Sequence, residues 1–135
     1  MTVIESIIRF LGDYEKERIG VDKLESRAVS YSLMKAPKEE VETYISGTEV
    51  HTGFYQLMAR LDTLSESERV ANNAWGQGIT EWIRQKDDRG EYPALDGYRC
   101  TGIGVSTPFY MGMADESSAV YQMTIEIKYV KEKKA

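Results

Sequence analysis

The chain has 135 residues, with 17 lysines and arginines against 22 aspartates and glutamates, so its formal net charge is −5. That acidic balance excludes a protein that coats nucleic acid, because neutralising phosphates requires a cationic surface. A single cysteine, Cys100, and a single histidine, His51, exclude an intrachain disulfide and a cysteine zinc site. We expect one globular domain at 1–135, in which no segment is apolar enough for a signal peptide or a membrane span.

The first third of the chain predicts one helix and one strand. Residues 2–17 are expected to form an amphipathic helix, because isoleucines and leucines recur three and four residues apart. Thr2 and Glu5 have the spacing of a capping box, which satisfies free backbone N–H groups at a helix start. Alternating polar and apolar residues predict a strand at 27–34, which Pro37 then ends.

The middle of the chain predicts a second, longer helix after two extended segments. The segment 41–45 could form a short strand or a helical turn, and 49–61 a longer strand. A helix is expected at 66–86, where another capping box precedes an apolar stripe. Gly76 and Gly78 lie inside this helix, where each costs roughly 1 kcal/mol relative to alanine, so another element should approach closely there. The stripe consists of Val70, Ala71, Ala74, Trp75, Gly78, Ile79, Trp82 and Ile83.

The last third of the chain predicts two strands. The first is expected at 98–105 and could resume at 109–113, beyond a proline. The second, at 118–130, is long for a small domain, which suggests an arm or part of a sheet shared between subunits. The lysine-rich end, 131–135, is expected to be a mobile tail. Together the elements predict an α+β fold, with a mainly antiparallel sheet of about four strands and two helices packed on one face.

The residues that could carry chemistry do not form a recognisable site. His51 and Cys100 could make a thiol–imidazole dyad, but no cysteine-hydrolase pattern surrounds either residue. The acidic pairs Asp87-Asp88 and Asp115-Glu116 lie in predicted turns and lack a third metal ligand. Gly102-Ile103-Gly104 precedes no helix that would cradle a phosphate, and it favours a bulge in a strand. We therefore predict no catalytic, cofactor-binding or metal-binding residue and no enzyme activity.

Tyrosines and methionines near the end of the chain are the remaining signal. Tyr110, Met111 and Met113 fall in a segment bounded by glycine and proline. Both residue types are enriched where proteins contact one another. The segment either contacts another protein or covers a small satellite core, and the sequence leaves both interpretations open.

Short segments spread along nearly the whole chain carry a family resemblance. They are Tyr31-Ser32-Leu33 with Pro37, Val41 through Gly47, Phe54 to Arg60, Asn72-Asn73 with Trp82-Ile83, Tyr92-Pro93-Ala94-Leu95, and Val120-Tyr121-Gln122-Met123 running to Tyr129. In order and spacing, this set is similar to the small "minor capsid" or tail-terminator proteins of long-tailed phages and prophages of Gram-positive bacteria.

The resemblance implies a structural protein of the virion, made in the cytoplasm of the bacterial host. Such a protein would form a homo-hexameric ring that caps the tail tube and joins it to the head. Its partners would be copies of itself, the tail tube protein and head connector proteins, while DNA passes through without specific binding. No cofactor, small-molecule substrate, membrane or catalytic residue is implied. The candidate interface residues are Tyr44, Phe54, Tyr110, Met111 and Met113.

Two alternatives remain open at this level. The first is another structural role in the phage neck, as a head-closure protein or connector adaptor. The second is a small α+β binding or enzymatic domain that uses His51 and Cys100. A polar cleft that encloses both side chains within bonding reach of each other would favour the second alternative.

Overall fold

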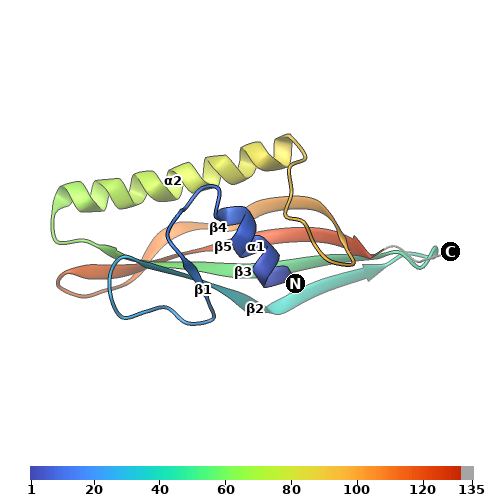
Figure 1. Ribbon diagram of the computed structural model, residues 1–135, viewed down its shortest axis with the longest axis horizontal. Coiled ribbons are helices and arrows are strands. Elements are labelled where there is room, and N and C mark those ends of the chain that lie inside the picture. Colours follow the sequence, from blue (N-terminus) through green and yellow to red (C-terminus); the bar gives the residue numbers. More distant parts are fainter. Residues whose placement is uncertain (132–135) are drawn as a thin grey trace.

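The computed structural model describes residues 1–131, which form two helices around a single five-stranded sheet. In chain order the elements are α1 (Val3–Leu11), β1 (Ile19–Val21), β2 (Ser30–Thr43), β3 (Glu49–Asp62), α2 (Glu66–Asp88), β4 (Arg99–Ala114) and β5 (Ser118–Lys131). The strand order is β1-β2-β3-β5-β4, and only the β1–β2 pair is parallel (Figure 1). The predicted α+β class is confirmed, but the sheet is mixed and has one strand more than the four expected.

Both predicted capping boxes are present, although the first helix is shorter than expected. α1 begins after Thr2, whose side chain accepts the Glu5 N–H, but it ends at Leu11 instead of continuing to residue 17. Tyr14, which extends the apolar periodicity of α1, leaves the helix and donates its hydroxyl to the Trp75 carbonyl of α2 at 2.9 Å. A tertiary contact therefore overrides the local periodicity.

The close approach predicted at the two helical glycines of α2 is confirmed. A Cβ atom at Gly76 would overlap the Phe109 ring, lying 2.8 Å from its Cε2 atom and closer still to Cγ and Cδ2. A Cβ atom at Gly78 would lie 2.5 Å from the Tyr14 hydroxyl. The two glycines let α2 sit directly on β4 and on the segment that follows α1.

Prolines do not end strands here, contrary to expectation. The predicted elements at 27–34 and 41–45 are two parts of one strand, β2, with a register shift between Lys35 and Glu39 that accommodates Pro37. β1 pairs only with the first part of β2, so Pro37 interrupts no further ladder on the outer side. β4 likewise runs through Pro108 as a single strand with several register shifts, at the outer edge of the sheet.

The long last strand lies inside the sheet, between β3 and β4. β5 pairs with β3 along its whole length, from Ser118 opposite Asp62 to Lys131 opposite Glu49, and with β4 on its other side. The prediction of a projecting arm is therefore wrong. Lys131 is a paired strand residue and not part of a tail, and 132–135 lie outside the described residues.

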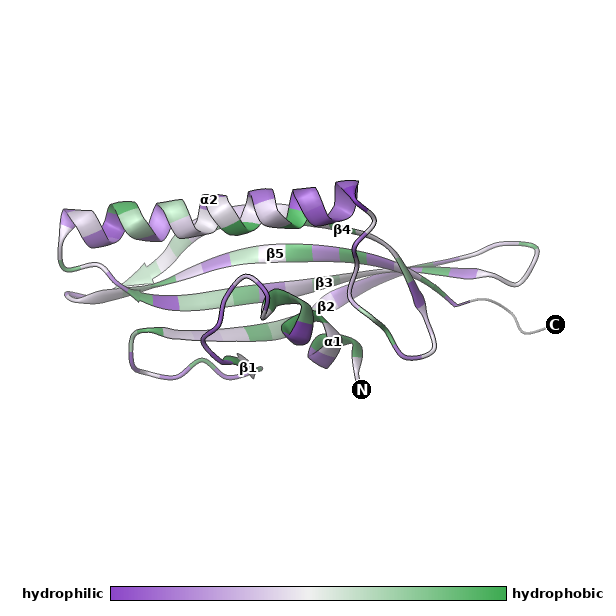
Figure 2. Ribbon diagram, turned by 45° about the horizontal axis from the view of Figure 1, so that its top comes forward, coloured by the Kyte–Doolittle hydropathy of each residue, from purple (hydrophilic) through white to green (hydrophobic). Residues whose placement is uncertain are grey.

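The core lies between the two helices and one face of the sheet. Every second residue of β5, from Ala119 to Tyr129, points into it, together with the matching residues of β3. α1 contributes Ile7 and Leu11 and α2 contributes Ile79 and Ile83. No helix or strand among residues 1–131 covers the opposite face, where residues such as Met58, Gln122 and Thr124 remain partly exposed (Figures 1 and 2).

Candidate assembly surfaces

The predicted interface residues occupy three separate places. Tyr110, Met111 and Met113 lie together on the last part of β4, beside the turn into β5. Tyr44 lies in the turn between β2 and β3, at the opposite end of the elongated molecule (Figure 1). Phe54 lies between these ends, on the uncovered face of the sheet. The structure therefore places three of the five residues at one strand end, with Tyr110 and Met111 on opposite faces of the sheet, and separates the other two.

The first end carries a group of exposed apolar side chains, here called the β4-end patch. Met113 is 79% exposed and Leu64 is 74% exposed. The Thr63 N–H donates to the Ser117 carbonyl at 2.9 Å, which ties the chain before α2 to the β4–β5 turn. The patch consists of Leu64, Val70, Tyr110, Met111 and Met113.

Two members of this patch were not predicted as interface residues. Val70 belongs to the apolar stripe expected to be buried on α2, yet it is 63% exposed because the first turns of the helix extend past the core. Leu64 directly precedes the N-cap, where a lone leucine has no periodicity to indicate its surroundings. Single exposed apolar residues are ordinary, whereas several at one end make that end a candidate contact surface.

The other end carries a smaller apolar group, here called the hairpin patch. It consists of Val41, Tyr44 and Ile45 on the β2–β3 hairpin, and the Ile45 side chain is fully exposed. Gly47 adopts a φ of 89°, which closes the turn with a hydrogen bond from its N–H to the Tyr44 carbonyl at 2.9 Å. The tight turn leaves Ile45 without neighbours to cover it.

The two outer edges of the sheet differ in charge. β4 has no charged side chain from Cys100 to Ala114, whereas the outer part of β2 carries Lys35, Lys38, Glu39, Glu40 and Glu42. Charged side chains protect an edge strand from pairing with another chain. At Ile103 the backbone N–H of the β4 edge already has a partner within the chain, because it donates to the Asp87 carboxylate of α2 at 3.1 Å. Beyond that point β4 lacks charged protection.

Phe54 belongs to neither patch. Its ring is partly buried on the open face, and the Lys38 Nζ atom lies 5.4 Å from the ring centroid. Such a cation–π contact already covers one side of the ring. Phe54 therefore contributes less free apolar surface than the sequence suggests.

The structure does not form the candidate dyad. His51 and Cys100 both lie opposite Tyr129, on its two sides, so two strand spacings, about 10 Å, separate their backbones. The His51 ring nitrogens instead approach Glu39 at 3.4 Å and Glu49 at 3.1 Å. Burial raises the pKa of Cys100 to about 11, so this residue is a thiol at neutral pH.

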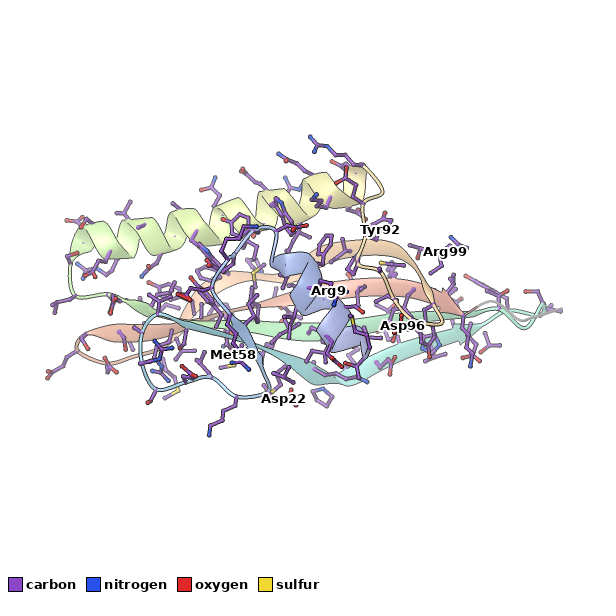
Figure 3. All side chains as sticks on the ribbon, viewed as in Figure 1. Arg9, Asp22, Met58, Tyr92, Asp96 and Arg99 are labelled. Atoms are coloured by element: carbon purple, nitrogen blue, oxygen red, sulfur yellow. The ribbon has the colours of Figure 1, made fainter. Side chains whose placement is uncertain are left out.

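The acidic pairs and the glycine segment have structural roles, although Asp87-Asp88 forms the last two residues of α2 and not the predicted turn. The Asp115 carboxylate accepts the N–H groups of Ser117 and Ser118 at 2.9 and 2.8 Å, as a turn residue does. Asp87 accepts the Tyr92 hydroxyl (labelled in Figure 3) at 2.9 Å in addition to the Ile103 N–H, a role that the sequence did not indicate. The predicted bulge is confirmed beside Gly102.

Residues 1–131 contain neither a cluster of metal ligands nor a helix that could span a membrane. Within residues 1–131, no three histidine, cysteine, aspartate or glutamate side chains gather as metal ligands would. Neither helix of that range has the length and apolar character needed to cross a membrane. In the comparisons with known proteins, no family model matches the chain. No curated protein matches it either.

Proposed function

We propose that this protein is a virion structural protein that caps the phage tail tube and joins it to the head, acting as a ring of identical subunits. The observation that carries the proposal is the placement of exposed apolar side chains in two different patches, which lie at opposite ends of the elongated molecule (Figure 1). Two unlike patches that contact each other form a heterologous interface, which generates either a closed ring or an open filament. Tyrosine and methionine suit the centre of such an interface.

The remaining surface is consistent with a structural role. The uncharged β4 edge offers backbone groups for pairing, whereas the charged side chains of the β2 edge oppose pairing. The two edges of the sheet are therefore unlike, as a heterologous contact requires. His51 and Cys100 do not meet, which removes the geometry on which the enzymatic alternative depended. The family resemblance suggests that the scaffold is a phage tail tube. The β4-end patch and the hairpin patch are the surfaces through which the subunits would contact one another.

The test uses two charge substitutions, one in each patch. Met113→Glu disrupts the β4-end patch and Ile45→Glu the hairpin patch, while Val21→Glu introduces the same change at an exposed residue outside both. Light scattering after size exclusion, with and without isolated tail tubes, reports the oligomer, and negative-stain images report rings or capped tube ends. We expect rings for the wild type and Val21→Glu, and monomers for the other two variants alone.

Mixing the two disabled variants gives the decisive result. Each retains the patch that the other lacks, so a heterologous interface allows one contact and the mixture forms dimers that neither variant forms alone. Dimers of either single variant would contradict a heterologous contact. Wild-type protein that neither forms rings nor binds tube ends would overturn the proposal. Binding to isolated heads and not to tails would assign the chain to head closure instead.

A further inference from the structure

A pocket of about 500 Å³ opens between the first turn of α1 and the sheet, next to the hairpin patch, because its lining residue His51 pairs with Val41. Three tyrosines and the only histidine line it: Tyr55, Tyr98, Tyr129 and His51. The rings contact one another, with His51 stacked on Tyr129 at a centroid distance of 5.1 Å and Tyr98 edge-on to both. One wall of the pocket is therefore aromatic, formed by residues of β3 and β5 and by the residue that precedes β4.

One polar group in this wall has no hydrogen-bond partner among residues 1–131. Tyr55 is only 3% exposed, and its hydroxyl makes no hydrogen bond with any residue in the described part of the chain. Burial, together with the charge of Glu39, raises the pKa of Tyr55 to about 12, so the hydroxyl stays protonated near that carboxylate. Because Tyr55 lines the open pocket, its hydroxyl is free to form a hydrogen bond with a molecule bound there.

The charges that line the pocket favour a cation. Glu39 and Asp22 contribute two carboxylates, and Lys35 is the one lysine among the lining residues. The Lys35 ammonium lies 3.6 Å from the Glu39 carboxylate with a side chain that is 55% exposed, which describes a loose ion pair at the rim. The other Glu39 oxygen accepts the Tyr129 hydroxyl at 2.9 Å, which fixes the carboxylate in place.

An anion would find little to bind here. The start of α1 borders the pocket, and free N–H groups at a helix start attract anions. In α1 that start is already neutralised, because the Glu5 carboxylate accepts both the Thr2 N–H, at 3.1 Å, and the Thr2 hydroxyl, at 2.8 Å. A bound anion would also face Glu39 and Asp22.

We propose that this pocket binds a guanidinium group, carried either by an arginine side chain of a partner polypeptide or by a free guanidino compound. A planar cation can stack on the tyrosine rings while its N–H groups donate to Glu39 and to the Tyr55 hydroxyl. The guanidinium displaces Lys35 from its loose contact with Glu39. The proposal rests on the residues of the pocket and not on the ring contacts proposed above.

The binding test uses matched small probes and wild-type protein. N-acetyl-arginine methylamide represents a peptide-borne side chain, free L-arginine represents the small-molecule source, and N-acetyl-citrulline methylamide is the uncharged control of the same shape. Titrations followed by two-dimensional NMR should give dissociation constants on the order of 1 mM for the arginine probes. Tighter binding of the blocked arginine indicates a polypeptide partner, and tighter binding of free arginine indicates a small molecule.

Three substitutions distinguish the pocket from a general charge effect. Glu39→Gln keeps the acceptor for Tyr129 but should weaken arginine binding at least about tenfold. Lys35→Gln should tighten binding by about two- to fivefold, because it removes the competing cation. Glu42→Gln changes the net charge equally from the opposite face of β2 and should leave binding unchanged.

Several outcomes would overturn the inference. They are equal binding of the citrulline probe, an unaltered affinity in Glu39→Gln, and chemical-shift changes that avoid the pocket. Because Lys35→Gln is expected to improve binding, a general loss of structure cannot imitate the full pattern. The NMR spectra also report directly whether each variant is folded.

Discussion

Replacing Gly76 with alanine should destabilise this protein, although the same change stabilises most exposed helices. In an open helix, glycine costs roughly 1 kcal/mol relative to alanine. At this position the added Cβ would overlap the Phe109 ring. That ring has little room to retreat, because it stacks on Tyr121 with an interplanar angle of 4° and also contacts Trp75.

The expected magnitude follows from two opposing effects. Overpacking a fitted contact costs about 1–3 kcal/mol, and the severe overlap with an aromatic ring places this case at the upper end. The gain in helix propensity returns about 1 kcal/mol. We therefore expect Gly76→Ala to lower the free energy of unfolding by about 2 kcal/mol.

A double-mutant cycle with Phe109→Ala isolates the contact. Once the ring is removed, Gly76→Ala should become stabilising by about 1 kcal/mol, so the coupling energy is about 3 kcal/mol. Urea denaturation followed by circular dichroism measures each variant, with Gln77→Ala as the exposed control on the same helix. A stabilising Gly76→Ala in the wild-type background, or a coupling energy near zero, would refute the reasoning.

Three further expectations concern single side chains. Tyr129→Phe should lower the free energy of unfolding by about 0.5–1.5 kcal/mol, because the partly exposed carboxylate of Glu39 loses a donor, whereas Tyr55→Phe should change it by less than about 0.5 kcal/mol. Equal losses in urea titrations would contradict this expectation. Burial raises the pKa of Cys100 to about 11, so iodoacetamide should alkylate it about 100-fold more slowly at pH 8 in the folded than in the unfolded protein, and equal rates measured by mass spectrometry would refute that expectation. Burial alone would raise the pKa of Glu39, but the Tyr129 hydroxyl and the charge of Lys35 hold it below the ordinary value. Its stabilisation is therefore present at neutral pH and lost as the pH falls through the lowered pKa, and Glu39→Gln should flatten the acid side of a plot of melting temperature against pH.

Local signals in the sequence predicted the features that neighbouring residues determine. Both capping boxes depend on side chains three residues apart, so Thr2 with Glu5 and Ser65 with Glu68 could be identified before the fold was known. The alternation of β5 likewise follows from the two-residue period of a strand that has one buried face. The conformational cost of Gly76 also indicated a close contact, although not with which residue.

The tertiary structure decided which surfaces are free. Pro37 and Pro108 predicted strand ends, because proline lacks a backbone donor. On the outer side of β2 and β4 no neighbouring strand requires that donor at these positions, so both strands continue. Val70 continues an apolar stripe, yet the core ends before it, and burial depends on what lies opposite. The pocket at Tyr55 joins residues from several elements that are distant in sequence. Sequence periodicity thus determined the helices and the buried strand faces, because these depend on adjacent residues, whereas the order of the strands and the packing of the helices on them set the edges, the end patches and the pocket.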